Sequence, residues 1–378
     1  MNKKLKILTV IGTRPEIIRL SRIIKKLDFY FNHILVHTGQ NFNHELSDIF
    51  FKELKLKKPT YNLNCKSKNS IEFISKSLIR FDKVLQIEKP DAVLVLGDTN
   101  SALNVLCAKK RKIPIFHIEA GNRCFDEAVP EEINRKIVDH ISDINMTYSS
   151  YASSNLKFEG IHQDRIIKIG SPLYEVYNHY SMQIENSNIL KRLKISEKNY
   201  ILASIHREEN VDNKKNLESI FNSIIKLRKN LKVNVIFSLH PRIQKKIKKF
   251  KLKFDKYIYF YKPFGFFDYV KLMKNAKIIL SDSGSITEET SILSVPTVNV
   301  RTSNERQEGM ERGLSIMSGL NPSDILSAAD IVLTNKKLKE FNNKIIYHDY
   351  AMSDVSETVV KIIQSYTHYI NKKTWFKL

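Results

Sequence analysis

Three carboxylates stand where a parallel α/β fold would bring them together. Asp98 and Glu119 each follow an apolar run, and Glu131 follows Pro130 at the start of a segment with helical periodicity. Neighbouring parallel strands lie about 4.8 Å apart, so side chains that follow them share one edge of the sheet. Two carboxylates in one pocket raise the pKa of one of them, which makes that group a usable acid. The spacing therefore predicts proton transfer.

Each of these acids also has a purely structural explanation. Asp98 suits a turn or a helix cap, and Glu131 and Glu132 would complement the dipole of the helix that they begin. We expect one of that pair to have the dipole role and the other to face the site. The catalytic interpretation is favoured because Asp98 and Glu119 follow successive strands.

A predicted anion site follows the first apolar run, in the motif IGTRPE. Gly12 permits a tight turn, and Pro15 suits the first position of a helix. The N–H groups at the start of that helix, together with the guanidinium of Arg14, would bind a phosphate. An ordinary turn with a solvated arginine explains the motif equally well.

Further anion-binding groups follow apolar runs in the second half of the chain. His206 and Arg207 follow one run and His240 follows the next. A later run leads into Ser283–Gly284–Ser285, where a turn of backbone N–H groups and two hydroxyls would hold a diphosphate. Glu289 begins the next helix, within reach of sugar hydroxyls. Helix capping is the structural alternative for this last stretch.

Short apolar strands alternate with helical periodicity, which is typical of parallel βαβ units. The pattern restarts at residue 200, after a polar segment (174–199) that we expect to be irregular. The sequence therefore predicts an α/β protein with two Rossmann-like, doubly wound domains. We place them at 1–172 and 173–355, followed by a C-terminal helical segment at 356–378. Ligands bind at the carboxyl ends of such strands, so two facing domains would form a cleft.

The composition excludes several classes of protein. No apolar run among the 378 residues approaches the roughly 20 residues that cross a bilayer, so we expect no membrane insertion. Three cysteines without a CxxC motif favour a reducing cytoplasm. The formal net charge of +22 would suit nucleic acid or an anionic membrane. We prefer lysines spread over solvated helix faces, because no nucleic-acid-binding motif accompanies them.

The sequence carries no signature of a bound cofactor. It lacks a GxGxxG loop after its first strand and a GxxxxGK[ST] loop, which disfavours NAD and P-loop nucleotide chemistry. Asp98, His117, Glu119 and His206 are metal ligands by type, but no HExxH-like spacing supports a metal site. We therefore predict an enzyme without metal or cofactor.

Eight motifs, in this order, resemble the non-hydrolysing UDP-N-acetylglucosamine 2-epimerase family: GTRPE, HTGQ, GDTNS, HIEAG, PEEINR, HREEN, HPR and SDSGSITEE. The resemblance covers nearly the whole chain. It implies a glycosyltransferase-B-like fold, a homodimer, a site between the domains and a C-terminal helix that crosses back to the first domain. The positions that match the family's catalytic and UDP-binding residues are Asp98, Glu119, Glu131 and His206, and Arg14, Ser283, Gly284, Ser285 and Glu289.

The resemblance also implies a mechanism. A carboxylate removes the C2 proton of a UDP-2-acetamido sugar while UDP departs, and UDP adds back as a proton reaches the opposite face. Asp98 and Glu131 are assigned to proton transfer, with Glu119 orienting or tuning them. Proton transfer at two faces needs two acid/base groups, and the departing diphosphate needs cations and N–H donors.

One loop departs from the pattern of most family members. Asn122–Asp126 resembles the subgroup that converts UDP-2-acetamido-2,6-dideoxy-L-talose to UDP-N-acetyl-L-fucosamine, which implies a role in capsule or O-antigen synthesis. UDP-N-acetylglucosamine and UDP-N-acetylmannosamine are the alternative substrate pair. A glycosyltransferase of the same fold is a further alternative, and the cluster of acids argues against it.

Overall fold

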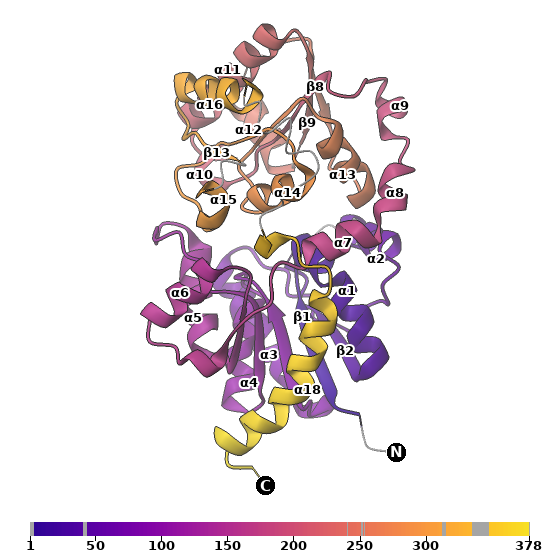
Figure 1. Ribbon diagram of the computed structural model, residues 1–378, viewed down its shortest axis with the longest axis vertical. Coiled ribbons are helices and arrows are strands. Elements are labelled where there is room, and N and C mark those ends of the chain that lie inside the picture. Colours follow the sequence, from indigo (N-terminus) through magenta and orange to yellow (C-terminus); the bar gives the residue numbers. More distant parts are fainter. Residues whose placement is uncertain are drawn as a thin grey trace. The chain divides into compact units, whose positions relative to one another are not determined.

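The computed structural model describes residues 4–40, 44–239, 241–250, 252, 254–311, 315–334 and 348–377 (Figure 1), without the side chains of 44–47, 241, 242 and 348. The chain divides into two compact units. The first consists of Met1–His179 and Asp349–Leu378, and the second of Tyr180–His348. Each unit contains one parallel sheet with helices packed against it, which confirms the predicted α/β fold class.

The first unit contains a seven-stranded sheet in the order β3-β2-β1-β4-β5-β6-β7. All of its neighbouring strands pair in parallel. The central strand β4 (Ala92–Leu96) is buried along its entire length, as expected for a strand covered on both faces. The other strands are β1 (Lys6–Ile11), β2 (Asn32–His37), β3 (Tyr61–Asn62), β5 (Ile115–Ala120), β6 (Ile144–Thr147) and β7 (Ile166–Lys168).

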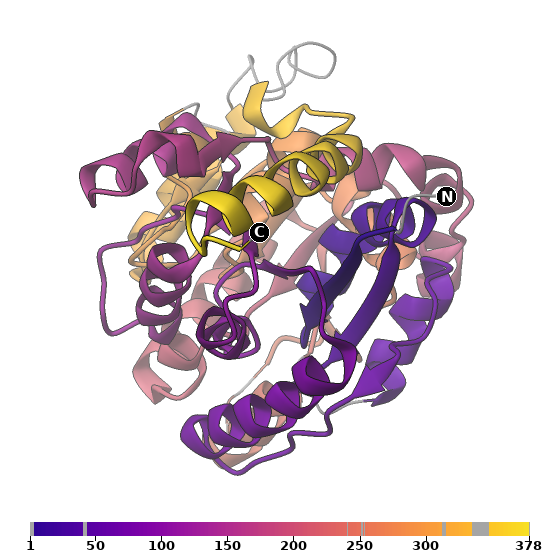
Figure 2. The same ribbon diagram turned by 90° about the horizontal axis from the view of Figure 1, so that it is seen from below.

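Amphipathic helices cover this sheet. Helix α1 (Arg14–Tyr30) buries Ile17, Leu20, Ile24 and Leu27, whose spacing of three and four residues defines one helix face. The other helices are α2 (His44–Glu53), α3 (Ser70–Glu88), α4 (Val105–Lys110), α5 (Pro130–Ile141), α6 (Ser150–Phe158), α7 (Leu173–His179) and α18 (Val355–Lys373). The termini of the chain lie on this unit, and Figure 2 shows α18 running across it.

The division between the units differs from the predicted boundaries. The chain leaves the first unit after His179, not after residue 172, because α7 packs on α1. Glu175 of α7 lies 4.0 Å from Arg22 and accepts the backbone N–H of Ser356 at 2.8 Å. The segment 174–199, expected to be irregular, forms α7, α8 (Ser181–Glu185) and α9 (Ile189–Leu193). Short helices in polar sequence lack the long periodic pattern that would have predicted them.

The second unit contains a six-stranded parallel sheet in the order β10-β9-β8-β11-β12-β13. Its strands are β8 (Tyr200–Ser204), β9 (Asn234–Ser238), β10 (Ile258–Tyr261), β11 (Ile278–Ser281), β12 (Thr297–Asn299) and β13 (Ile316–Met317). Its longer helices are α11 (Lys214–Leu231), α12 (Pro241–Phe250), α13 (Phe266–Asn275), α14 (Ile286–Leu293) and α16 (Pro322–Thr334). Phe221 of α11 stacks on Phe237 of β9 at 5.3 Å and joins the helix to the sheet.

Parallel pairing has one consequence for function. The carboxyl ends of all strands in a sheet, and the loops that follow them, lie at the same edge. In the first unit Asp98 lies in such a loop and Glu119 lies at the carboxyl end of β5, and in the second unit these loops carry His206 and Ser283. Within the described part of the chain, no helix is long and apolar enough to cross a membrane.

Two glycines allow a matched test of packing at one of these loops. Gly121 and Gly160 both have left-handed backbones, with φ of 82° and 85°. A Cβ at Gly121 would lie 2.2 Å from the carbonyl oxygen of Ala152, whereas one at Gly160 would meet nothing within 4 Å. We expect Gly160→Ala to lower the free energy of unfolding by about 1–2 kcal/mol through backbone strain alone. Gly121→Ala should cost roughly 2 kcal/mol more because of overpacking. Urea denaturation measures both, and equal costs would contradict the packing argument.

Candidate active site

Glu119 occupies an unusual backbone position at the end of β5. Its φ of 69° is left-handed, and the pairing of β5 with β6 shifts register between Ile118 and Ala120. This irregularity turns the carboxylate towards the β4 loop, since a Cβ on Gly97 would lie 3.6 Å from Glu119 Oε2. Gly97 precedes Asp98, so the structure brings the loop that carries Asp98 and the side chain of Glu119 together.

An arginine holds Asp98. The Nε and Nη2 atoms of Arg135 donate to Asp98 Oδ2 at 3.0 and 2.6 Å. The Nη1 atom of the same guanidinium donates to Glu132 Oε2 at 2.7 Å. Glu132 is fully buried and also accepts the backbone N–H groups of Cys124 and Phe125 at 3.1 and 3.0 Å. Helix α5 thus joins the Asp98 loop to the loop that follows β5.

Glu131 lies in the first turn of α5, next to these contacts. Asn134 of the same helix donates to the backbone carbonyl of Asp98 at 2.9 Å, which docks the start of α5 on the β4 loop. Glu131 is half-buried, whereas Glu132 is consumed by structural contacts. The sequence predicted separate roles for these two acids, and Glu132 has the structural one.

Glu119 also lies near an arginine. Its Oε2 atom is 3.8 Å from Nη1 of Arg19, a buried residue on α1. The sequence suggested that Asp98 and Glu119 would act mainly on each other as like charges. In the structure Asp98 contacts Arg135 and Glu119 approaches Arg19, so a cation accompanies each acid. Charge repulsion between the two acids is therefore reduced.

The predicted anion site at the start of α1 is already filled by a side chain of the chain itself. Glu16 Oε2 accepts the backbone N–H groups of Gly12 and Thr13 at 2.7 and 2.6 Å, and the Thr13 hydroxyl at 3.0 Å. The N–H groups of the turn that leads into α1 are therefore occupied within the chain, and anion binding at Arg14 stays a prediction. The sequence did not reveal this occupancy because a capping Glu in this position also fits an empty turn. Arg14 remains at the turn, half-buried, with Cζ 6.0 Å from the Phe50 ring centre.

A buried cluster of polar side chains binds the loops that follow β4 and β5. His117 Nε2 lies 3.0 Å from the Gly97 carbonyl, and Nδ1 lies 2.9 Å from Asp139. Asp139 also accepts from Arg123 at 2.7 Å and from the Gly121 N–H. Burial alone would raise the pKa of Asp139, but His117 and Arg123 hold that pKa below its usual range. The loops therefore rest on an ionised carboxylate.

In the second unit, Asp282 organises the turn that carries His206 and Arg207. This fully buried carboxylate follows β11 and accepts the N–H groups of both residues at 2.9 Å. It also lies 3.2 Å from His206 Nδ1 and accepts from Asn210 at 3.0 Å. Burial raises the pKa of Asp282, but His206, Asn210 and Arg207 outweigh that effect and keep it low. The imidazole of His206 remains partly exposed at this sheet edge.

The Ser283–Gly284–Ser285 turn follows directly. The hydroxyls of Ser283 and Ser285 lie 2.9 Å apart, and Ser285 donates to Glu289 at 3.1 Å. The backbone N–H of Ser283 donates to the hydroxyl oxygen of Ser281 at 3.1 Å. The turn therefore places two hydroxyls and the start of α14 beside His206 and Arg207, as its position at the end of β11 predicted.

Arginines surround Gly284. A Cβ on Gly284 would lie 2.0 Å from Glu305 Oε1 and 3.2 Å from Arg207 Nη2, so a larger residue here would displace the Glu305 carboxylate. Arg306 donates to the Gly284 carbonyl at 3.1 Å, and Arg301 lies 2.8 Å from Glu305. The turn thus lies beside guanidinium groups that are paired with the carboxylates of Glu305 and Glu288.

His240, predicted as a phosphate contact, lies outside the described residues. The other ten predicted positions fall into two groups. Arg14, Asp98, Glu119 and Glu131 lie at the strand ends of the first unit, and His206, Arg207, Ser283, Gly284, Ser285 and Glu289 lie at those of the second. Among the residues that the structure describes, no three His, Cys, Asp or Glu side chains are placed to hold a metal ion.

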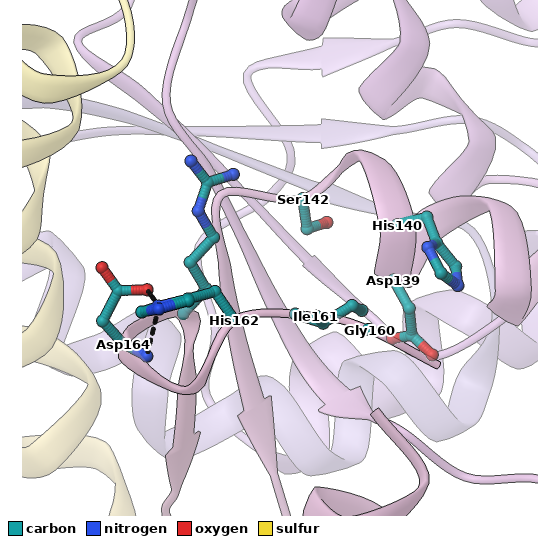
Figure 3. A pocket seen from close by; sticks show the side chains of 8 residues that line it. Asp139, His140, Ser142, Gly160, Ile161, His162 and Asp164 are labelled. Carbon is teal, nitrogen blue, oxygen red and sulfur yellow. Dashed lines mark hydrogen bonds and ion pairs between the residues drawn. The ribbon is translucent and has the colours of Figure 1, made fainter. Parts of the chain in front are cut away.

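A separate pocket of 390 Å³ lies elsewhere on the first unit. It is lined by residues that lead into β6 and β7, including His140, Ser142, His162 and Arg165 (Figure 3). The imidazole of His162 contacts Asp164 at 2.6 Å. None of the predicted site residues lines this pocket, so it is distinct from both strand-end groups.

Several residues that shape these groups were not singled out from the sequence: Glu16, Arg19, Arg135, Asp282, Glu305 and Arg306. Two of them had a usable signal. Arg135 lies one helical turn after Glu131 and Glu132, on a face that an i, i+3 pair with Glu132 would define. Asp282 precedes the serine turn at the end of a strand. The partners of Glu16 and Glu305 depend on tertiary packing.

Comparisons with known proteins identify the family of this chain. The sequence profile for UDP-N-acetylglucosamine 2-epimerase matches residues 25–364. UDP-N-acetylglucosamine 2-epimerase of Methanocaldococcus jannaschii is 40% identical over 88% of this chain and 93% of its own. The structure of UDP-N-acetylglucosamine 2-epimerase from Rickettsia bellii superposes with a TM-score of 0.89 at 44% identity, covering 99% of this chain and 100% of that one.

A further solved structure contains ligands. The M. jannaschii enzyme in complex with UDP-GlcNAc and UDP superposes with a TM-score of 0.89 at 37% identity, covering 95% of this chain and 99% of that one. Fold and strand-end groups together define an α/β enzyme built from two doubly wound units. The chain belongs to the non-hydrolysing UDP-N-acetylglucosamine 2-epimerase family, a family of isomerases. The predicted family and enzyme class are confirmed.

The pKa of Glu16 is raised and that of Asp282 is lowered, so the two acids can be compared by the pH dependence of stability. Burial raises the pKa of Glu16 from 4.5 to about 7, against the effect of its hydrogen bonds from Thr99, Gly12 and Thr13. A raised acid pKa means that the folded state binds more protons, so Glu16 lowers stability progressively as pH rises from about 4.5 to about 7. We expect Glu16→Gln to gain about 2–3 kcal/mol relative to the wild type between pH 5 and pH 8.

Asp282→Asn provides the control for that measurement. The pKa of Asp282 is lowered, so Asp282 stays ionised in both states above pH 5, and the stability difference of its variant should be constant there. Urea denaturation at pH 5, 6, 7 and 8 measures both. A pH-independent difference for Glu16→Gln would show that Glu16 does not titrate in this range.

Proposed function

We propose that this protein interconverts C2 epimers of a UDP-linked 2-acetamido sugar by eliminating UDP and adding it back. A carboxylate of the first unit removes the C2 proton while the anomeric C–O bond breaks, which leaves a 2-acetamidoglycal and UDP. UDP then adds to the anomeric carbon while a second acid delivers a proton to the opposite face of C2. The balance of atoms requires no oxidant and no metal.

The observation that carries this proposal is the gathering of Asp98, Glu119 and the start of α5 at one sheet edge. In the hydrogen bonds described above, Arg135 binds only Oδ2 of Asp98. The Oδ1 atom is the one that we propose as the base. Two groups that exchange protons with opposite faces of one carbon must come from different elements. Asp98 on the β4 loop and Glu131 on α5 meet that requirement, and Glu119 orients them.

The second unit would supply the UDP site. The Ser283–Ser285 turn and Arg207 are proposed to bind the diphosphate, and Glu289 the ribose hydroxyls. His206, held by Asp282, would stabilise the departing phosphate, as would Arg14 from the first unit. His240 is proposed as a further diphosphate contact.

The preferred substrate that we propose is UDP-2-acetamido-2,6-dideoxy-L-talose, which would give UDP-N-acetyl-L-fucosamine for capsule or O-antigen synthesis. The support comes from the Asn122–Asp126 loop, which Glu132 ties to the Asp98 support through the N–H groups of Cys124 and Phe125. Phe125 is 66% exposed and has a left-handed φ of 56°. An exposed ring beside the site suits the C6 methyl group of a 6-deoxy sugar. UDP-N-acetylglucosamine is the second candidate, because the similar proteins carry that name.

We also propose a homodimer that works in the cytoplasm. Helix α3 exposes Ile71, Ile79 and Ile87, each more than 60% exposed, and a second copy of the chain would cover them. The three cysteines are free thiols, which suits a reducing compartment. Light scattering of the purified chain distinguishes a dimer from a monomer.

Isotope exchange tests the reaction class. In deuterated water, the wild type should place deuterium at C2 of a UDP-2-acetamido sugar and form its epimer, because each proton returned comes from solvent. Asp98→Asn should reduce exchange by at least 100-fold, in line with loss of a general base, while UDP binding changes little. Asp82→Asn, on the exposed face of α3, is the control. Normal turnover by Asp98→Asn would refute the proton-transfer role.

Phe125 tests the choice of sugar. We expect Phe125→Ser to lower kcat/KM for the 6-deoxy sugar by roughly 5–10-fold relative to UDP-N-acetylglucosamine, the value of one methyl contact. Phe158→Ser, on the far end of α6 and 90% exposed, should change neither value. If both sugars respond equally to Phe125→Ser, the ring does not select the C6 group. A wild type that turns over only UDP-N-acetylglucosamine would decide for the second candidate.

A further inference from the structure

The start of α1 contains a built-in anion. Glu16 is 2% exposed, and its carboxylate accepts N–H groups from Gly12 and Thr13. The hydroxyl of Thr13 donates to the same oxygen, and the hydroxyl of Thr99 donates to the other at 2.7 Å. The two N–H groups belong to the turn that leads into α1, where a phosphate could accept the same hydrogen bonds. Glu16 therefore occupies the place that a ligand's negative charge would favour.

None of these hydrogen bonds to the Glu16 carboxylate comes from a charged group. Arg14 and Arg19 lie on its own helix, and Arg19 approaches Glu119. The facing elements contribute further charges from Asp98 on the β4 loop, Glu119 on β5 and Arg135 on α5. His37 on β2 is titratable, but its Nδ1 accepts the N–H of Gly39 and is therefore unprotonated. All four donors to Glu16 are neutral groups.

Protonation would leave this turn intact. Two of the four donors are hydroxyls, and a hydroxyl oxygen also accepts a hydrogen bond. A protonated Glu16 can therefore donate from Oε1 to Thr99 while Oε2 keeps the N–H groups of Gly12 and Thr13. Burial already raises the pKa of this carboxyl to about 7. The proton is thus exchangeable at neutral pH with little structural change.

We propose that Glu16 takes up a proton when the diphosphate of a nucleotide binds beside Arg14. This inference rests on the proposed function, which places the diphosphate at Arg14. An added negative charge at the start of α1 opposes the ionised form of Glu16. Once Glu16 is neutral, the helix dipole and Arg14 act on the phosphate alone. The negative charge of the diphosphate thereby replaces that of Glu16 at the start of α1.

The sign of the pH dependence follows. Above about pH 7 Glu16 is ionised in the free protein and protonated in the complex, so binding consumes a proton. Affinity then falls as pH rises, by up to tenfold per pH unit, until Glu16 also ionises in the complex. Well below pH 7 Glu16 is protonated in both states and contributes no pH dependence.

Calorimetry of UDP binding measures the linked proton. Wild type and Glu16→Gln are titrated with UDP at pH 7.5 in PIPES and in Tris, whose ionisation enthalpies differ. The buffer dependence of the binding heat gives the number of protons taken up. Every other ionisable group is common to the two proteins and cancels, so the difference isolates Glu16. We expect the wild type to take up a fraction of a proton more per site than Glu16→Gln.

Equal proton numbers in the two proteins would overturn the inference. Glu88→Gln, at the C-terminal end of α3, is the matched control and should behave as wild type. If Glu16→Gln does not fold, Thr99→Val replaces it. Loss of the Thr99 hydroxyl removes a donor to the ionised form, so proton uptake should shift from pH 7.5 towards pH 8.5, and an unshifted profile would refute the proposal. Failure of the wild type to bind UDP would instead refute the proposed function itself.

Discussion

Buried carboxylates that accept backbone N–H groups hold the strand-end loops of both units. Glu16 binds the turn after β1, Glu132 and Asp139 bind the segment after β5, and Asp282 binds the turn after β8. A buried N–H without a partner is costly, so a loop that closes on such a carboxylate has one preferred conformation. The exposed charged residues of the candidate site are displayed on these fixed loops.

The same acids differ in what stabilises them, and that difference separates support from chemistry. Asp139 has Arg123 and His117, and Asp282 has His206 and Asn210, so both remain ionised. Glu16 has neutral donors only, and its proton is exchangeable near neutral pH. Asp98 shares Arg135 with Glu132, which ties the proposed base to the loop that carries Phe125. The guanidinium of Arg135 therefore connects the Asp98 loop to the loop that carries Phe125.

The two units divide the charge in a way that matches the proposed reaction. Carboxylates with attendant arginines occupy the strand ends of the first unit, while a serine turn among Arg207, Arg301 and Arg306 occupies those of the second. Proton transfer at carbon and departure of a diphosphate need these opposite environments. The net charge of +22 suits the anionic ligand and requires no nucleic-acid partner.

The sequence by itself determined the α/β class and the placement of Asp98, Glu119 and Ser283 at strand ends, because periodicity and parallel topology depend on local pattern. It did not reveal helices α7 to α9, whose short polar segments have no long period. Only the tertiary structure decided that Glu16 fills the turn after β1, that Glu132 is structural, and that Arg135 clamps Asp98. Those outcomes depend on which side chains burial brings within hydrogen-bonding distance, and residues as far apart in the chain as Glu16 and Thr99 meet only after the sheet has formed.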